Sequence, residues 1–162
     1  MDNEISTPVT QELDDLDIPY RIFTHPEPVK SLEQAARERG QEPEQVIRSL
    51  LFRLSAEEFV LALMAGPGQV DWKTLRRYVG EKRLTTADEE EMLRVTGYRR
   101  GAVSPLGLPQ PLRILTDPAV FAPKEISIGS GVRGTTVILR SADLRRALQD
   151  VEIVSLSKSN RQ

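Results

Sequence analysis

Segments with helical periodicity and segments with strand character follow one another along this chain in an irregular order. Two strand-like segments, residues 50–52 and 59–63, are adjacent and indicate a hairpin closed by residues 55–58. Regular strand–helix–strand units, which a doubly wound or barrel fold requires, do not recur. The pattern therefore predicts an α+β (irregular α/β) fold, in which a mixed, mostly antiparallel sheet is wrapped by helices.

The expected helices are short, and capping residues mark their ends. Thr7-Pro8 predicts an N-cap followed by proline at the first helical position. Ser31-x-x-Gln34 and Thr86-x-x-Glu89 match capping boxes. Further helices are expected from Pro43 through Val46 towards Arg48, from Asp71 and from Ser141, with ends at Gly40, Gly80 and Gly97. The other expected strands are residues 20–24, 113–116, 125–128, 135–139 and 151–154.

The charge of the chain is unevenly distributed. Its 162 residues suit a single domain, 1–162, and its 22 basic and 24 acidic residues give a net charge of −2. Residues 1–18 contain six acids and no base and predict an acidic N-terminal helix, whereas the remainder carries 22 − 18 = +4. Residues 155–162 are expected to form a polar tail. Because binding responds to local potential, the near-neutral total does not exclude an anionic partner.

The residue inventory narrows the chemistry. The chain has no Cys, which excludes disulfides, zinc–thiolate sites, iron–sulfur clusters and thiol nucleophiles. It has one His, His25, which leaves one candidate imidazole base beside a proline; a capping or turn role is the alternative. We expect no metal and no cofactor. The longest apolar run, residues 59–65, is far shorter than the ~20 residues of a membrane span, so we expect a cytoplasmic protein.

Two glycine-rich loops, residues 96–107 and 128–134, are the most informative stretches. Such loops let backbone N–H groups approach a ligand closely. The spacing Gly129-x-Gly131-x-x-Gly134 matches a dinucleotide fingerprint, but a strand rather than a helix is expected after it, which favours a hairpin turn. The basic pair Arg99-Arg100 lies directly before Gly101 in the first loop. The residues alone thus predict a glycine-lined ligand pocket with cations beside it.

An ordered series of landmarks extends over most of the chain. They are His25-Pro, Ser31-Leu-Glu-Gln-Ala-Ala36, Val46-Ile-Arg-Ser-Leu-Leu-Phe52, Leu61-Ala-Leu-Met-Ala-Gly66, Thr96-Gly-Tyr-x-x-Gly-Ala-Val-Ser-Pro-Leu-Gly107, Ile128-Gly-Ser-Gly-Val-Arg-Gly134 and Asp143-Leu144. With these landmarks in this order, the chain resembles the YbaK/ProX family of aminoacyl-tRNA deacylases, which is related to the editing domain of bacterial prolyl-tRNA synthetases. The resemblance implies the α+β fold of that editing domain.

The resemblance also implies an activity and a site. The activity is hydrolysis of the ester of a mischarged tRNA, such as Cys- or Ala-tRNA(Pro), by water, with backbone amides and the substrate's own ribose hydroxyl assisting. A small pocket would select the amino acid by size. The implied catalytic residues are Arg48 and Gly101, and the implied substrate-binding residues are Tyr20, Ser31, Ser49, Ala102, Val103, Ser104, Pro105, Gly129, Ser130 and Gly131.

The chain departs from the family pattern at two positions. The family places a functionally important Lys where this chain has Arg48, and many members carry an acid where it has Thr136. Arg48 could bind the terminal phosphate as the Lys does, or mark a weak or inactive enzyme, or point into solvent from a helix end. The alternative function is therefore a module that binds an aminoacyl-nucleotide, a tRNA 3′ end or a small metabolite. The implied partner is the 3′ acceptor end of a mischarged tRNA, with an aminoacyl-tRNA synthetase as a second candidate.

Overall fold

The computed structural model describes residues 5–55 and 57–158, and its short elements lie close to the expected ones. The helices are α1 (Pro8–Asp15), α2 (Leu32–Arg39), α3 (Trp72–Val79), α4 (Glu89–Thr96) and α5 (Ser141–Leu148), with 3-10 turns η1 (Pro43–Gln45) and η2 (Pro118–Phe121). The strands are β1 (Arg21–Thr24), β2 (Ile47–Ser55), β3 (Glu58–Ala65), β4 (Thr85–Thr86), β5 (Arg113–Thr116), β6 (Glu125–Gly129), β7 (Thr135–Arg140) and β8 (Glu152–Ile153). The α+β class is confirmed.

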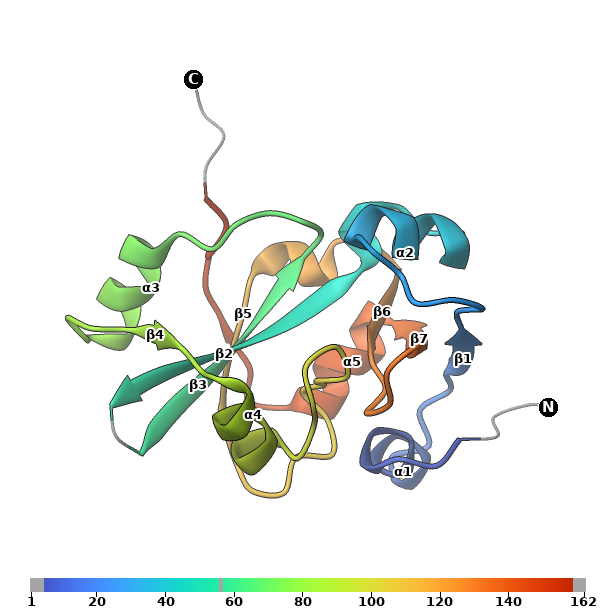
Figure 1. The fold of residues 1–162 in the computed structure, drawn as a ribbon, viewed down its shortest axis with the longest axis horizontal. Coiled ribbons are helices and arrows are strands. Elements are labelled where there is room, and N and C mark those ends of the chain that lie inside the picture. The colour runs from blue at the N-terminus through green and yellow to red at the C-terminus, as the bar shows by residue number, and fades with distance from the viewer. Residues whose placement is uncertain (1–4, 56, 159–162) are drawn as a thin grey trace.

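The strands form two sheets, where the sequence analysis expects one. Strands β1, β7 and β6 form an antiparallel sheet in that order. The second sheet has the order β4-β2-β3-β5-β8, and it is mixed because β5 pairs in parallel with both β3 and β8. In Figure 1 the sheet of β2 and β3 occupies the left of the molecule and the sheet of β1, β6 and β7 the right.

The two sheets meet along a seam between the start of β2 and β6. A parallel bridge joins Val46 to Ser127, and Gln45 Nε2 donates to Glu125 O at 2.8 Å. On the side of β2 opposite β3, β4 pairs only with Phe52 and Arg53. Within the described chain, the first half of β2 therefore has no neighbouring strand on that side. This open edge of β2 faces the loops that the sequence analysis singles out.

Two apolar clusters lie on opposite faces of the mixed sheet. Along β3, Leu61 and Leu63 pack between the sheets, while Ala62 and Met64 pack against the other face with Leu75 of α3. This division follows from the alternation of side chains along a strand. The core between the sheets fixes β2 relative to β6 and thereby holds the seam in place.

Several local expectations are confirmed. Thr7 caps α1 with Pro8 following it, Asp71 caps α3, and glycines in the left-handed conformation end α2, α3 and α4. The hairpin of β2 and β3 and the hairpin of β6 and β7 are both present, so residues 129–134 form a strand-to-strand turn and no dinucleotide site. Residue 56 of the first turn lies outside the described residues.

Four helix starts need correction. The helix expected from Pro43 towards Arg48 is only the turn η1, because Val46 and Ile47 are β-branched and Arg48 already pairs with Met64 in the sheet. Thr86 lies in β4 instead of capping a helix.

The capping box of α4 is formed by Asp88 and Glu91: Asp88 Oδ1 accepts from Glu91 N at 2.8 Å, and Glu91 Oε1 accepts from Asp88 N at 2.9 Å. Ser31 caps α2, but the Gln34 side chain accepts from Lys30 N instead of completing the box. Ser141 is the first residue of α5 and gives it no side-chain cap.

The two ends of the chain also differ from expectation. The acidic segment 1–18 forms the helix α1 only over Pro8–Asp15, and its acids Asp2 and Glu4 lie outside the described residues. The expected polar tail, 155–162, contains a buried residue, Leu156, and the buried Asp117 side chain accepts hydrogen bonds from Leu156 N and Ser157 N at 2.8 and 2.9 Å. Residues 159–162 of that tail lie outside the described residues. Among the helices of the described residues, none is long and apolar enough to cross a membrane.

Candidate active site

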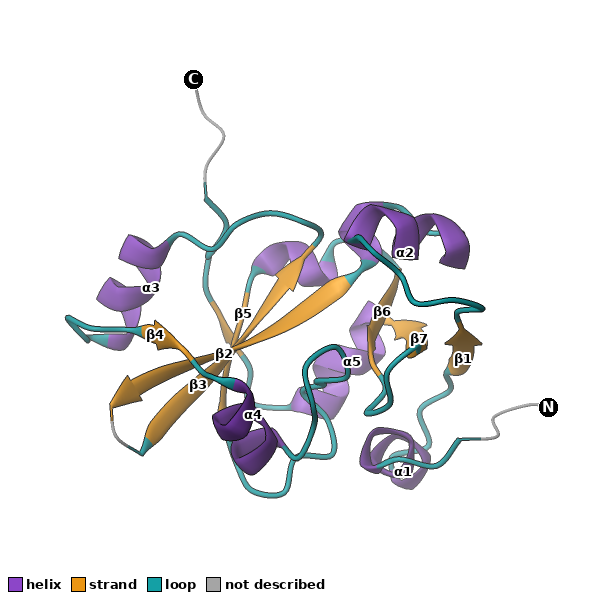
Figure 2. Cartoon of the chain, in the orientation of Figure 1, coloured by secondary structure: helices purple, strands orange, loops and turns teal. Residues whose placement is uncertain are grey.

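A cavity of about 420 Å³ opens at the seam between the two sheets. Its walls come from the open edge of β2, from the loop after α4, from the end of β6 and the start of β7, and from the end of α2. The long loop between α4 and β5 is drawn in teal in Figure 2. The lining residues are Arg39, Val46, Ile47, Arg48, Ser49, Leu50, Leu51, Thr86, Ala87, Met92, Arg100, Gly101, Val103, Ser127, Ile128, Gly129, Thr135 and Thr136.

The cavity brings together five residues that the sequence analysis assigns to the site. Arg48 and Ser49 come from β2, Gly101 and Val103 from the loop after α4, and Gly129 from the end of β6. These segments are far apart in the sequence and converge only through the packing of the two sheets. Arg48 lies on strand β2 and lines the cavity. The alternative that Arg48 points into solvent from the end of a helix is therefore wrong.

The side chain of Arg48 is held by a neighbouring loop. Its Nε donates to Gly66 O at 2.8 Å, and Nη2 donates to Gly68 O. Burial lowers the pKa of Arg48, because a guanidinium ion loses hydration there. Arg48 therefore lines the cavity while its guanidinium group shapes the loop that leads to α3.

The wall formed by the two glycine loops depends on close backbone contacts. A Cβ at Gly129 would lie 2.0 Å from Val103 O, and Gly131 N donates to Ala102 O at 3.0 Å. Gly101 has φ of +87°, the left-handed region that favours glycine. The glycines thus allow the loop after α4 to rest directly on the β6–β7 turn.

The other five loop and turn residues assigned from the resemblance lie behind this wall or away from it. Ala102, Ser104 and Pro105 are buried in the loop, and Ser104 Oγ accepts from Leu106 N at 3.2 Å. Ser130 Oγ is engaged within its own turn, where it donates to Thr135 O at 2.8 Å. Together with Gly131, these residues support the cavity and do not line it.

Tyr20 and Ser31 are placed outside the cavity. Tyr20 Oη donates to Asp14 Oδ1 at 3.0 Å, and burial followed by this contact raises the pKa of Tyr20. Ser31 Oγ caps α2 by accepting from Gln34 N at 3.0 Å. In the structure both side chains hold local elements in place.

The electrostatics of the cavity are one-sided. Three arginines, Arg39, Arg48 and Arg100, line it, and none of its described lining residues is acidic. Thr136, at the position where many relatives carry an acid, lines the cavity with its hydroxyl already donated to Ile128 O at 2.8 Å. Within residues 5–55 and 57–158, no group of three or more His, Asp or Glu side chains could hold a metal ion. The site therefore suits a ligand with negative charge.

One lining hydroxyl has no partner. Ser49 Oγ is buried and forms no hydrogen bond within the described part of the chain. Because a buried hydroxyl without a partner is costly, this atom is a candidate for a direct ligand contact. Among the described loop amides, Gly101 N and Val103 N also have no internal acceptor, whereas Ala102 N donates to Arg99 O at 3.0 Å.

Sequence reasoning missed Arg39 and Ser127 at the cavity. Arg39 lies in the last turn of α2, where a basic residue is explained by the helix dipole alone, and Ser127 sits in the middle of a strand. Neither has a local sequence signal, because their approach depends on how α2 packs over the seam.

The fold and this cavity define the class of the protein. Residues 26–147 match the aminoacyl-tRNA editing domain family, so the chain belongs to that family and is an aminoacyl-tRNA deacylase. The resemblance to the YbaK/ProX deacylases is thereby confirmed.

Individual relatives agree with this class. The chain is 29% identical over 144 residues to the multifunctional Ser/Thr-tRNA deacylase ProXp-y of Escherichia coli (strain K12), covering 86% of this chain and 85% of that protein. It is 36% identical over 88 residues to the proline–tRNA ligase of Streptococcus uberis, covering 54% of this chain but only 14% of the ligase. A solved structure described as a candidate trans-editing enzyme for prolyl-tRNA synthetase shares the fold, with a TM-score of 0.81 at 23% identity over 96% of this chain and 100% of that one.

Proposed function

We propose that the chain acts in trans on tRNAs that carry a wrong, small amino acid, and that the seam cavity holds the aminoacylated 3′ end. The observation that carries the proposal is the convergence of Arg48, Ser49, Gly101, Val103 and Gly129 on one cationic cavity. A cationic pocket of this size suits a terminal nucleotide with its ester-linked amino acid. The partner is the 3′ acceptor end of the tRNA. Association with a synthetase and a cytoplasmic location, where tRNA is charged, belong to the same proposal.

The proposed chemistry is attack of water on the ester carbonyl. Gly101 and Val103 line the cavity, and their backbone amides have no internal acceptor in the described chain, so these amides are the proposed donors to the oxyanion. Removing one such donor typically costs about 10²–10³ in rate. We propose that the ribose hydroxyl next to the ester takes up the proton of the attacking water and passes its own proton to the ribose oxygen that leaves as the ester C–O bond breaks, since the one imidazole of the chain, His25, does not line the cavity.

The buried hydroxyl of Ser49 indicates which aminoacyl ester the cavity prefers. The resemblance to the YbaK/ProX family implies Cys- or Ala-tRNA(Pro) as the substrate, whereas the relative from Escherichia coli is named a Ser/Thr-tRNA deacylase.

 A site built to hydrogen-bond a substrate hydroxyl discriminates strongly against an analogue that lacks it. Since Ser49 Oγ has no partner within the described chain, we expect serine or threonine esters to be hydrolysed faster than alanine or cysteine esters.

A deacylation panel tests this proposal. tRNA(Pro), tRNA(Ser) and tRNA(Thr) charged with Ser, Thr, Ala, Cys or Pro are incubated with the protein, and release of the free amino acid is compared with release in buffer. We expect accelerated release of Ser or Thr and no acceleration for Pro. In Ser49→Ala the preference for Ser or Thr over Ala should fall at least tenfold. An unchanged preference in that variant would contradict the role of Ser49, and no acceleration for any charged tRNA would contradict the deacylase itself.

A second candidate function rests on Arg48. Its guanidinium already donates to Gly66 O and Gly68 O, so a binding module that uses Arg48 to shape the pocket is the alternative to an efficient enzyme. Arg48→Lys separates the two, because an ammonium keeps the charge but cannot make both of these fork-shaped contacts. Activity that appears only in Arg48→Lys favours the module. Activity that is present in the native chain and falls in the variant favours the enzyme.

A further inference from the structure

Arg39 is a cation at the cavity for which the fold provides an unusual support. It is the last residue of α2 and lines the cavity. Its Nε donates to His25 Nε2 at 3.1 Å, and its Nη1 donates to Ser127 Oγ at 2.8 Å. These two contacts come from different parts of the chain and fix the plane of the guanidinium group.

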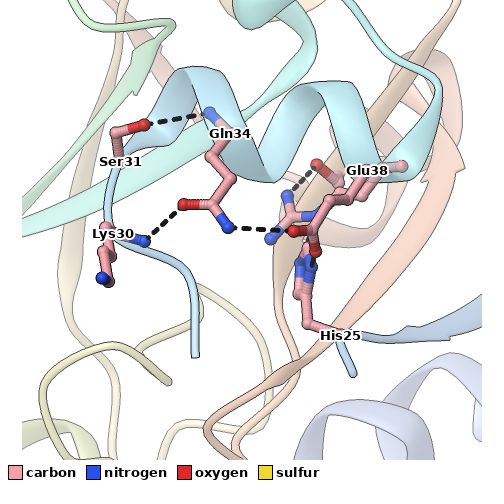
Figure 3. A network of polar contacts seen from close by, with 7 residues as sticks. His25, Lys30, Ser31, Gln34 and Glu38 are labelled. Atoms are coloured by element: carbon pink, nitrogen blue, oxygen red, sulfur yellow. Dashed lines mark hydrogen bonds and ion pairs between the residues drawn. The ribbon is translucent and has the colours of Figure 1, made fainter. Parts of the chain in front are cut away.

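The support continues behind His25. His25 Nδ1 lies 2.6 Å from Glu38 Oε1, and Gln34 Nε2 donates to Glu38 Oε2 at 3.0 Å. Figure 3 shows Glu38 between Gln34 and His25. Because an arginine Nε–H can only donate, His25 Nε2 must be the acceptor, and the proton lies on Nδ1, from which it is donated to Glu38. The bond from His25 is the largest cause of the lowered pKa of Glu38, which keeps this carboxylate ionised.

The charge of Arg39 is not matched at the cavity. Within the described residues its remaining N–H groups have no acceptor and it forms no ion pair, while Glu38 is directed at His25 and Gln34. Burial lowers the pKa of Arg39 to about 10, so the side chain is still charged at neutral pH. Two further arginines line the same cavity, and none of its lining residues in the described part of the chain is acidic. A ligand oxygen with negative charge is the group that would complete this site.

We propose that Arg39 is a second anion-binding residue of the cavity, positioned by Glu38 through His25, and that it binds a phosphate oxygen of the tRNA 3′ end. This inference rests on the proposed function for the source of the phosphate. The planar fork of a guanidinium matches two oxygens of one phosphate group.

Binding of an uncharged RNA minihelix that ends in CCA tests the proposal without hydrolysis. Its affinity is measured by fluorescence anisotropy from 25 to 200 mM salt for the native chain, Arg39→Gln and the matched control Arg37→Gln. Arg37 lies on the exposed side of the same helix. We expect Arg39→Gln to weaken binding at least tenfold and to reduce the salt slope by about 0.7, the value for one single-strand phosphate contact. The control should change affinity less than twofold.

A double-mutant cycle tests the positioning role of His25. His25→Phe keeps a ring in the site but removes the acceptor for Arg39 Nε. We expect it to weaken RNA binding about fivefold in the native background and to have no further effect in Arg39→Gln, because the two residues act as one unit. Equal effects in both backgrounds would show that His25 supports only the fold.

Two small anions identify the source of the phosphate. Since the chain has a single His, its imidazole NMR signals report on this site without ambiguity. We expect AMP and inorganic phosphate to shift these signals in the native chain and not in Arg39→Gln, with the RNA binding more tightly than either. Free phosphate binding as tightly as RNA would assign the site to a free anion and overturn the tRNA contact.

The outcomes also separate this inference from the deacylase proposal. RNA binding that depends on Arg39, without hydrolysis of any charged tRNA, would leave Arg39 in place and contradict the deacylase. Native affinity and salt slope in Arg39→Gln, or no RNA binding by the native chain at 25 mM salt, would overturn the inference. If Arg39→Gln does not fold, Arg39→Lys takes its place. We expect the RNA affinity of Arg39→Lys to lie between that of the native chain and the tenfold weaker affinity expected for Arg39→Gln.

Discussion

At the scale of single residues, the cavity wall depends on the absence of a side chain at Gly129. Since a Cβ there would lie 2.0 Å from Val103 O, an alanine can be accommodated only if the loop after α4 moves away from the turn between β6 and β7. Gly101 and Val103, which belong to the loop held by this contact, line the cavity. The requirement for glycine at this position is therefore steric, and it links the packing of two loops to the proposed chemistry.

Gly129→Ala should lower both stability and activity. We expect the free energy of unfolding to fall by about 1–3 kcal/mol, as for other overpacked sites, and deacylation to fall at least tenfold because the loop amides move. Urea denaturation and a deacylation assay measure the two effects. Gly68→Ala is the control for stability, because a Cβ there meets nothing within 4 Å and φ is not positive; it should change the free energy of unfolding by less than about 1 kcal/mol. Equal stability of the two variants would contradict the close contact.

Tyr98 is a second residue on which the loop after α4 depends. Its ring is buried, and its Oη donates to Leu106 O at 2.6 Å across the loop. Burial raises the pKa of Tyr98, so the phenol stays protonated and remains a donor. Tyr98→Phe should lower the free energy of unfolding by about 1–3 kcal/mol, because the buried carbonyl loses its donor. Urea denaturation measures this loss, and a native value would show that the hydrogen bond contributes nothing.

At the scale of elements, the sequence predicts most strands and helix ends but not how the elements meet. Gly40, Gly80 and Gly97 end helices as expected, since a glycine in the left-handed conformation is a local signal. Pro43 predicts a helix that runs towards Arg48, yet the β-branched residues before Arg48 and its pairing with Met64 place Arg48 in β2.

The division of the strands into two sheets has no local signal either. It depends on the bridge from Val46 to Ser127 and on the packing of the core between the sheets. Because the cavity depends on this non-local packing, Arg39 could not be found from the sequence, and the five assigned residues that line the cavity were identified as site residues through the family resemblance. Tyr20 and Ser31, which the resemblance assigns to the site, serve α1 and α2 in the structure.

The side chain of Asp117 helps to hold the C-terminal segment in place, in addition to the pairing of β8 with β5. Asp117 Oδ2 accepts from Leu156 N, Ser157 N and Ser157 Oγ at 2.8–2.9 Å, and Oδ1 accepts from Ala119 N at 2.9 Å. Asp117→Ala should therefore lower the free energy of unfolding by roughly 2–4 kcal/mol, since several buried donors lose a charged acceptor. Asp117→Asn keeps one acceptor oxygen and should lose less. Urea denaturation of both variants checks this order, and the reverse order would contradict the anchor.

At the scale of the whole molecule, three carboxylates couple stability to pH. Contacts with His25, with the backbone of Thr74 and with Arg113 lower the pKa of Glu38, Asp71 and Glu152 respectively. A carboxyl whose pKa is lower in the folded than in the unfolded state stabilises the fold above its unfolded pKa, and this contribution disappears as the pH falls through the folded value.

We therefore expect the free energy of unfolding to be nearly constant from pH 7 to pH 5 and to fall as the pH drops below about 4.5, the ordinary pKa of a glutamic acid. Urea denaturation at several pH values measures the change. In Glu152→Gln the decline on the acid side should be less steep, because one of the three carboxyl groups is missing. A decline of native steepness in that variant would contradict the contribution of the pair with Arg113.

The central claim is that the cavity at the seam of the two sheets hydrolyses aminoacyl-tRNA. The most direct test is the single-turnover rate of serine release from mischarged tRNA by the native chain, by Arg48→Met and by Arg37→Met, which removes an exposed arginine away from the cavity. We expect release well above the buffer rate for the native chain and for Arg37→Met, and at least a tenfold loss in Arg48→Met. Equal rates in Arg48→Met and Arg37→Met, or a native rate no faster than buffer, would contradict it.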